Sequence, residues 1–171
     1  MRRALAMVMA LGLLASAALP VLAGGKPEWV ANEPADPLEF AAGEVCDFDL
    51  RIADAVNTGH TITFPESNGS QRVLGGGHLV TTVTNLESNE AVTLNISGPG
   101  KLVFRGDLLS LTGGGPWLIY LFPGDVGGAG LWFTRGAVAL DIDLVSGAVV
   151  SLSLPRNSID VCELLGGAAA D

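Results

Sequence analysis

Short runs in which apolar and polar residues alternate make up most of the sequence after residue 44. Alternation with a period of two puts the apolar side chains on one face of an extended strand, whereas a helix requires a period near 3.6. Segments rich in Gly, Pro, Asn, Asp and Ser separate these runs and favour turns. The pattern predicts about eight or nine short strands. They correspond to the runs CDFDLRI, HTITF, HLVTTVTN, AVTLNIS, KLVF, WLIYLF, LWFTRGAVALDIDL and AVVSLSL.

This pattern is typical of a single all-β domain, which we expect over residues 44–165. An antiparallel β-sandwich is favoured because disulfide-closed secreted domains often adopt it, and a small β-barrel is the alternative. Residues 24–43 contain several prolines and show neither period, so they predict an irregular N-terminal arm. Residues 166–171 predict a flexible tail that is too short to span a membrane.

Residues 1–23 have the parts of a secretory signal peptide, with Arg2 and Arg3 followed by an apolar run and small residues. Pro20 interrupts the run, and polar residues without basic stop-transfer flanks follow it, so we favour cleavage after Ala23 over a transmembrane anchor. The sequence therefore predicts a secreted, extracellular protein with no membrane anchor.

Cys46 and Cys162 are the only cysteines of the chain. In an oxidising compartment two such residues predict one disulfide bond between the early part of the domain and its last segment. Neither has a histidine or second cysteine at the spacing of a metal site. A free reactive thiol or metal ligand is therefore the weaker alternative.

The chain is acidic, with a net charge of −9, and cleavage would remove two arginines and make it more so. Binding to a phosphate backbone or an anionic membrane requires clustered Lys and Arg, so nucleic acid is an improbable partner. No glycine-rich loop leads into a helix as a phosphate site requires, so no cofactor is predicted. We expect an extracellular protein or a glycan as the partner.

Two pairs of aspartates alternate along predicted strands, Asp47 with Asp49 and Asp141 with Asp143. Each pair would lie on one strand face, and four carboxylates would gather if the two strands were neighbours. Such a cluster could bind calcium or provide the acid and base of a glycosidase. A solvated acidic strand face is the favoured interpretation, so the sequence assigns no catalytic residue and no metal site.

The segments TVTNLESNEAVTLNISGPG and PWLIYLFPGDVGGAGL and the terminal VC resemble uncharacterised secreted proteins of actinobacteria, loosely over residues 44–162. The resemblance implies a secreted all-β domain. It implies no known activity and transfers no catalytic or binding residue.

Residues 117–135 predict a hairpin that is apolar on both faces. If loop 123–130 is symmetric, Leu121 pairs with Trp132, and one core face collects Trp117, Ile119, Leu121 and Trp132, continuing into Val138, Leu140 and Ile142. The other face is too apolar to be left in water. Either Trp29 or Phe40 of the arm covers it, or it binds a ligand or a second copy of the chain. This possible binding surface comprises Tyr120, Phe122, Leu131, Phe133 and Arg135.

These features favour a non-catalytic extracellular binding or interaction domain over an enzyme. A small glycosidase-like hydrolase that uses the paired aspartates, or a secreted inhibitor, is the alternative. The residues do not identify the ligand or partner.

Signal cleavage and disulfide formation give a direct prediction. Intact mass spectrometry of the secreted protein should show a chain that begins at Gly24 and is two hydrogens lighter than its reduced form. Alkylation without reduction should add nothing, whereas two alkyl groups on the unreduced protein would overturn the disulfide.

Overall fold

The computed structural model describes residues 27–33, 35–66 and 69–167. The predicted signal peptide and most of the predicted tail lie outside this part of the chain. The described residues form short antiparallel strands and one short helix. These elements are β1 (Trp29–Ala31), β2 (Leu38–Phe40), β3 (Leu50–Asn57), β4 (His60–Pro65), β5 (Gln71–Gly76), β6 (Leu79–Asn85), β7 (Ala91–Asn95), β8 (Gly100–Arg105), β9 (Leu108–Gly113), β10 (Pro116–Leu121), β11 (Gly130–Arg135), β12 (Val138–Asp143), β13 (Val149–Ser153), β14 (Ile159–Asp160) and α2 (Val161–Leu164).

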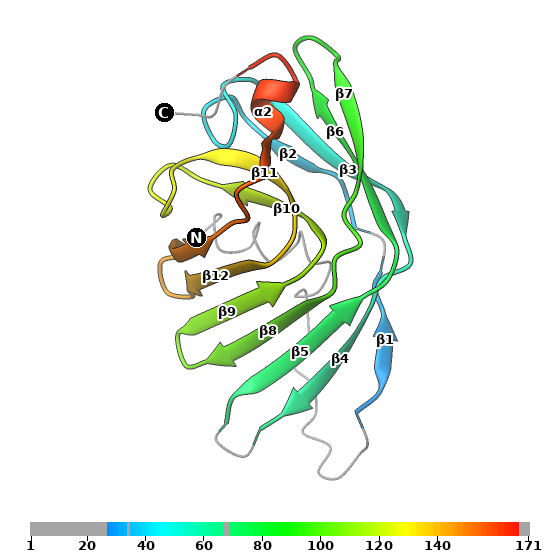
Figure 1. The fold of residues 1–171 in the computed structure, drawn as a ribbon, viewed down its shortest axis with the longest axis vertical. Helices are drawn as coiled ribbons and strands as arrows, with labels where there is room; N and C mark the ends of the chain where they lie inside the picture. Colours follow the sequence, from blue (N-terminus) through cyan, green and yellow to red (C-terminus); the bar gives the residue numbers. More distant parts are fainter. Residues whose placement is uncertain (1–26, 34, 67–68, 168–171) are drawn as a thin grey trace.

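The strands belong to three antiparallel sheets, and none of the three closes into a barrel. The largest has seven strands in the order β1-β4-β5-β8-β9-β12-β13, and a second has four in the order β2-β3-β6-β7. A third, of three strands in the order β10-β11-β14, lies between them, with β12 and β9 on one side and β2 and α2 on the other (Figure 1). We call them the seven-stranded, four-stranded and middle sheets. The predicted all-β sandwich-like class is confirmed.

The middle sheet is packed on both faces because its strands are apolar on both. One face, with Tyr120, Phe122, Leu131 and Phe133, joins a buried cluster with residues of β2, β3, β6 and α2. The opposite face joins a second cluster with residues of the seven-stranded sheet. Its members include Trp117, Ile119, Leu121, Trp132, Val138, Leu140 and Ile142. The division of the hairpin into two faces is therefore as predicted.

The predicted hairpin register is wrong by two residues, which corresponds to a turn displaced by one residue. Trp132 lies opposite Ile119 rather than Leu121, and Leu121 lies opposite Gly130. The N–H of Phe122 donates to Asp125 Oδ2 at 2.7 Å, which takes Phe122 out of the ladder and into the turn. Because the shift in register is an even number of residues, every side chain keeps its predicted face.

The N-terminal arm is not irregular throughout. β1 pairs with β4 at the edge of the seven-stranded sheet, and β2 pairs with β3 at the edge of the four-stranded sheet. Short edge strands tolerate nearby prolines because one side of each needs no ladder partner. Phe40 of β2 contacts the rings of Tyr120 and Phe122, with centroids 5.2 and 5.9 Å apart. Trp29 instead lies more than half exposed, edge-on to His60.

Sequence patterns missed two central strands and placed others incorrectly. β5 and β9 are absent from the predicted runs because each is a short apolar stretch that continues directly into glycines, which favour turns. The run LWFTRGAVALDIDL is two strands, since the chain leaves the middle sheet after Arg135 and enters the seven-stranded sheet at Val138. The segment with Cys46 precedes β3 rather than forming part of it.

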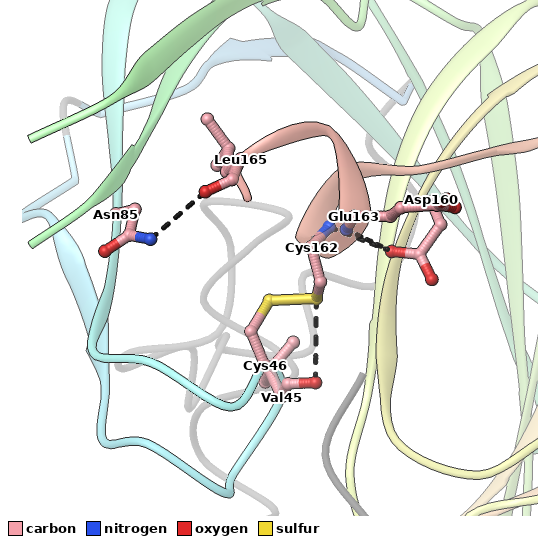
Figure 2. Close-up of a disulfide and its surroundings, with 7 residues drawn as sticks. All are labelled: Val45, Cys46, Asn85, Asp160, Cys162, Glu163 and Leu165. Atoms are coloured by element: carbon pink, nitrogen blue, oxygen red, sulfur yellow. Dashed lines mark hydrogen bonds between the residues drawn. A yellow bond between two sulfur atoms is a disulfide. The ribbon is translucent and has the colours of Figure 1, made fainter. Parts of the chain in front are cut away.

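A disulfide joins Cys46 to Cys162, with their Cα atoms 5.5 Å apart across 116 residues of sequence. Cys162 lies in α2, whose first turn is capped by Asp160 Oδ1, which accepts from the N–H groups of Cys162 and Glu163 (Figure 2). Asn85 Nδ2 donates to the Leu165 carbonyl at 3.1 Å (Figure 2). The disulfide joins the C-terminal turn to the segment that precedes β3, and the hydrogen bond joins it to β6 of the four-stranded sheet.

Removing the disulfide should lower the free energy of unfolding strongly. Replacing both cysteines with serine, as Cys46→Ser with Cys162→Ser, should cost up to about 5 kcal/mol because the loop it closes in the unfolded chain is long. Urea unfolding measures the loss. As the control, reductant should destabilise the native protein and leave the double variant unchanged. Equal stability of the native protein and the variant without reductant would contradict the structural role of the disulfide.

Candidate functional site

The seven-stranded and four-stranded sheets meet at a corner where, after β3, the chain crosses between them three times, in addition to the segment between β1 and β2. The crossings are residues 58–59, 77–78 and 96–99, each of which contains glycine. Two of them pass so closely that a Cβ on Gly77 would lie 2.6 Å from the Gly59 Cα. Gly77 also has a φ of 132°, which disfavours other residues. Small residues are therefore a steric requirement of this corner.

A row of glycines crosses the inner face of the seven-stranded sheet beside the corner. Gly75 of β5 lies opposite Gly100 of β8, and Gly100 lies opposite Gly113 of β9. Thr61 and Val138 continue the row at its two ends. Directly opposite residues share a face, so three adjacent strands lack side chains along one line.

The Trp117 indole occupies one part of this row. A Cβ on Gly98, Gly100 or Gly113 would lie 2.4 to 2.6 Å from atoms of the indole ring. Trp117 Nε1 donates to the Gly114 carbonyl at 3.3 Å. The ring therefore packs against bare backbone. By contrast, a Cβ on Gly75 would meet only Thr61 Cγ2, at an ordinary contact distance of 3.6 Å.

The space above the row that Trp117 does not fill is a cavity of about 170 Å³. Its floor is the seven-stranded sheet, its roof is the four-stranded sheet, and β10 of the middle sheet forms a wall. The middle sheet has three strands, fewer than either outer sheet, and β10 supplies the middle-sheet residues of the cavity lining. The cavity is lined mainly by apolar side chains: Leu38, Ile52, Leu79, Ile96, Leu102, Leu111, Trp117, Leu118, Ile119, Tyr120, Leu140 and Ile142.

Polar side chains gather where the cavity reaches solvent. Asp36 and Asp54 line it and are exposed, and Asn32 and Asn57 lie beside them half-buried. The chain between β1 and β2 supplies Asn32 and Asp36, so it spans from one outer sheet to the other at this mouth. The cavity thus has an apolar interior and an acidic entrance.

The Asn32 side chain carries an unsatisfied acceptor. Its Oδ1 atom is buried and has no hydrogen-bond partner within the described part of the chain. An unpaired buried acceptor costs about 1–3 kcal/mol, so such atoms are uncommon in folded proteins. This atom belongs to a residue that lines the cavity. A ligand that donates a hydrogen bond there would remove the penalty.

The possible binding surface predicted from the hairpin is filled by the chain itself. Tyr120, Phe122, Leu131 and Phe133 are each at most 7% exposed, and they pack in the cluster that includes Phe40. Arg135 is exposed, with its guanidinium carbon 5.3 Å from the centre of the Phe133 ring. Tyr120 also lines the cavity. Of this set, it is the residue that the structure brings to the candidate site.

The predicted aspartate pairs do not share a location in the sheets. Asp141 and Asp143 lie in β12 of the seven-stranded sheet, whereas Asp47 and Asp49 precede β3 of the four-stranded sheet. β12 pairs with β9 and β13, so the neighbouring strands required for a carboxylate cluster do not occur. Among the described residues, no group of three or more His, Cys, Asp or Glu side chains could hold a metal ion.

Two of these aspartates have evident roles in local structure. Asp49 Oδ1 accepts from the Ala42 N–H at 2.8 Å. Asp143 Oδ1 accepts from the Ser146 N–H and hydroxyl and from the Val145 N–H in the turn after β12. The hydrogen bonds from Ser146 lower the pKa of Asp143 below its usual value, and the bond from the backbone N–H has a larger effect than the bond from the hydroxyl. Stabilisation of the charged carboxylate is what a turn cap requires.

No protein-family model, curated protein or solved structure matches this chain. No helix in the described ranges is long and apolar enough to span a membrane.

Adding a methyl group beneath Trp117 should destabilise the protein. Gly100→Ala should cost about 1–3 kcal/mol because the new Cβ would overlap the indole and force it to move. Gly114→Ala is the matched control, since nothing lies within 4 Å of its Cβ position, and it should change stability by less than about 0.5 kcal/mol. Urea unfolding compares the two; equal stability would contradict the packing of Trp117 on this row.

Proposed function

We propose that this protein is an extracellular binding domain that takes a small apolar molecule, or the apolar part of a larger one, into the corner cavity. The single observation that carries the proposal is a cavity of about 170 Å³ that lies between the seven-stranded and four-stranded sheets and is lined mainly by apolar side chains. Ligand sites are typically concave and apolar, with a few polar groups that orient the ligand.

Cavity size supports a ligand about as large as one aromatic ring. An apolar cavity of about 150 Å³ is enough to bind benzene. Protein interiors are otherwise close-packed, and a void of this size forfeits dispersion contacts around its lining. Alanine at Gly75 would fit without overlap, so close packing alone does not require the glycine. A ligand that fills the space gives a reason for leaving it open.

The extracellular setting of the proposal rests on the predicted signal peptide and is supported by the disulfide, which is typical of oxidising compartments. Membership of a group of secreted actinobacterial proteins remains a prediction from sequence resemblance. No specific observation favours the hydrolase alternative, because Asp141 and Asp143 lie in the seven-stranded sheet whereas Asp47 and Asp49 precede a strand of the four-stranded sheet. No specific observation favours the inhibitor alternative either.

Filling the cavity should abolish binding without loss of the fold. Gly75→Leu places a side chain above the glycine row, and its Cβ meets only ordinary contacts. Toluene should bind the native protein with a dissociation constant of about 1 mM or below and bind Gly75→Leu at least about tenfold more weakly. The melting temperature of the variant should not fall, because the leucine side chain gains apolar contacts in space that is otherwise unfilled.

Gly114→Leu is the control, because residue 114 is outside the cavity lining and has open space at its Cβ position. It should bind toluene like the native protein in a titration followed by NMR chemical shifts. The proposal fails if the native protein binds none of a panel of small apolar ligands, or if Gly75→Leu binds them equally well.

A further inference from the structure

We infer that the ligand of the corner cavity carries a hydrogen-bond donor, as a hydroxyl or an ammonium group, next to its apolar body, and that the cavity selects against carboxylates. The inference rests on the proposed function and deepens it by naming the chemistry of the ligand's polar group. It follows from which hydrogen-bonding and charged groups the cavity mouth offers and which of them are already used.

The mouth is rich in acceptors and negative charge. Asp36 and Asp54 contribute two carboxylates, whereas the described residues that line the cavity include no Lys, Arg or His. Asn32 adds a buried Oδ1 atom with no partner in the described ranges. An anionic ligand group would therefore meet like charge without a compensating cation, and a cationic group would be attracted.

Most donors of the lining, in contrast, already have acceptors. Asn57 Nδ2 donates to Asp54 Oδ2 at 2.9 Å, and Ser97 Oγ donates to the Leu79 carbonyl at 3.2 Å. Thr81 Oγ1 donates to the Ala53 carbonyl at 3.0 Å. The Trp117 indole N–H is likewise used within the loop before β10. A ligand that must accept hydrogen bonds would find few donors without displacing these contacts.

Thr61 of β4 lines the floor of the cavity, carries a hydroxyl group and is only 6% exposed. A hydroxyl can both donate and accept hydrogen bonds, so Thr61 is compatible with a ligand hydroxyl. It does not oppose the preference of the cavity mouth for a hydrogen-bond donor. The Asn32 oxygen can only accept. Together these groups match a neutral alcohol, and the two carboxylates add attraction for an ammonium group.

Four ligands with one ring and different polar groups test the inference: toluene, benzyl alcohol, benzylammonium and benzoate. They are titrated into the protein with its disulfide intact, and the indole N–H signal of Trp117 is followed by NMR. Benzyl alcohol and benzylammonium should bind at least as tightly as toluene, and benzoate should bind at least about tenfold more weakly than benzylammonium at low salt. Raising the salt concentration should narrow the difference between the two ions.

Variants assign the preference to named groups. Asn32→Leu should reduce binding of benzyl alcohol by about tenfold relative to toluene, because the acceptor is lost while the apolar lining remains. Asp36→Asn should weaken the binding of benzylammonium relative to that of benzyl alcohol. Glu87→Gln is the control, because it neutralises an exposed carboxylate outside the cavity lining and should leave both affinities unchanged.

The outcomes separate this inference from the proposed function. If toluene binds and benzoate binds as tightly as benzylammonium, the cavity is a binding site but the donor preference is wrong. If Asn32→Leu leaves the ratio of benzyl alcohol to toluene affinity unchanged, Asn32 is not the recognising acceptor and the inference fails. If none of the four ligands binds, the proposed function itself fails.

Discussion

The apolar character of both faces of the middle sheet is the constraint on which the rest of the structure depends. Tyr120, Phe122, Leu131 and Phe133 project from one face, and burying each stabilises the fold by about 1.5–3 kcal/mol. Their sum, on the order of 10 kcal/mol before unfolded-state burial is subtracted, exceeds the largest contribution expected of the disulfide. Hydrophobic covering therefore determines the three-layer arrangement, and the disulfide reinforces it.

The cavity is a geometric consequence of this arrangement. A narrow middle sheet between two wider ones leaves a space at the corner where the outer sheets join. Trp117 fills part of that space and can do so only because Gly100 and Gly113 lie beneath it. The rest is bounded by Gly75, and its open mouth is lined by polar residues that include Asn32 and Asp36 from the chain between β1 and β2. The same glycine row thus accommodates a packed aromatic ring at one place and an open cavity beside it.

The period of two predicts the all-β class and the two faces of the hairpin, because side-chain alternation is a local property of extended chain. It does not fix register, and Asp125 moves the turn by one residue through a hydrogen bond that composition does not reveal. The cavity is not predictable from the sequence. Gly75, Gly100 and Gly113 have the composition of turn residues, and only strand pairing aligns them in one row. Likewise, the sequence predicts Phe40 as one residue that could cover the apolar face of the hairpin. It does not predict that Phe40 belongs to a strand paired with β3, because that pairing depends on tertiary context.

Native-state hydrogen exchange tests the central claim, that the doubly covered middle sheet is the most stable part of the fold. The account predicts that ladder amides between β10 and β11 exchange only through global unfolding, with a free energy equal to that from urea unfolding. Amides of β1, at an exposed edge, should exchange through local opening at a clearly lower free energy. Exchange of the β10–β11 amides through local opening, at free energies no higher than those of β1, would contradict the account.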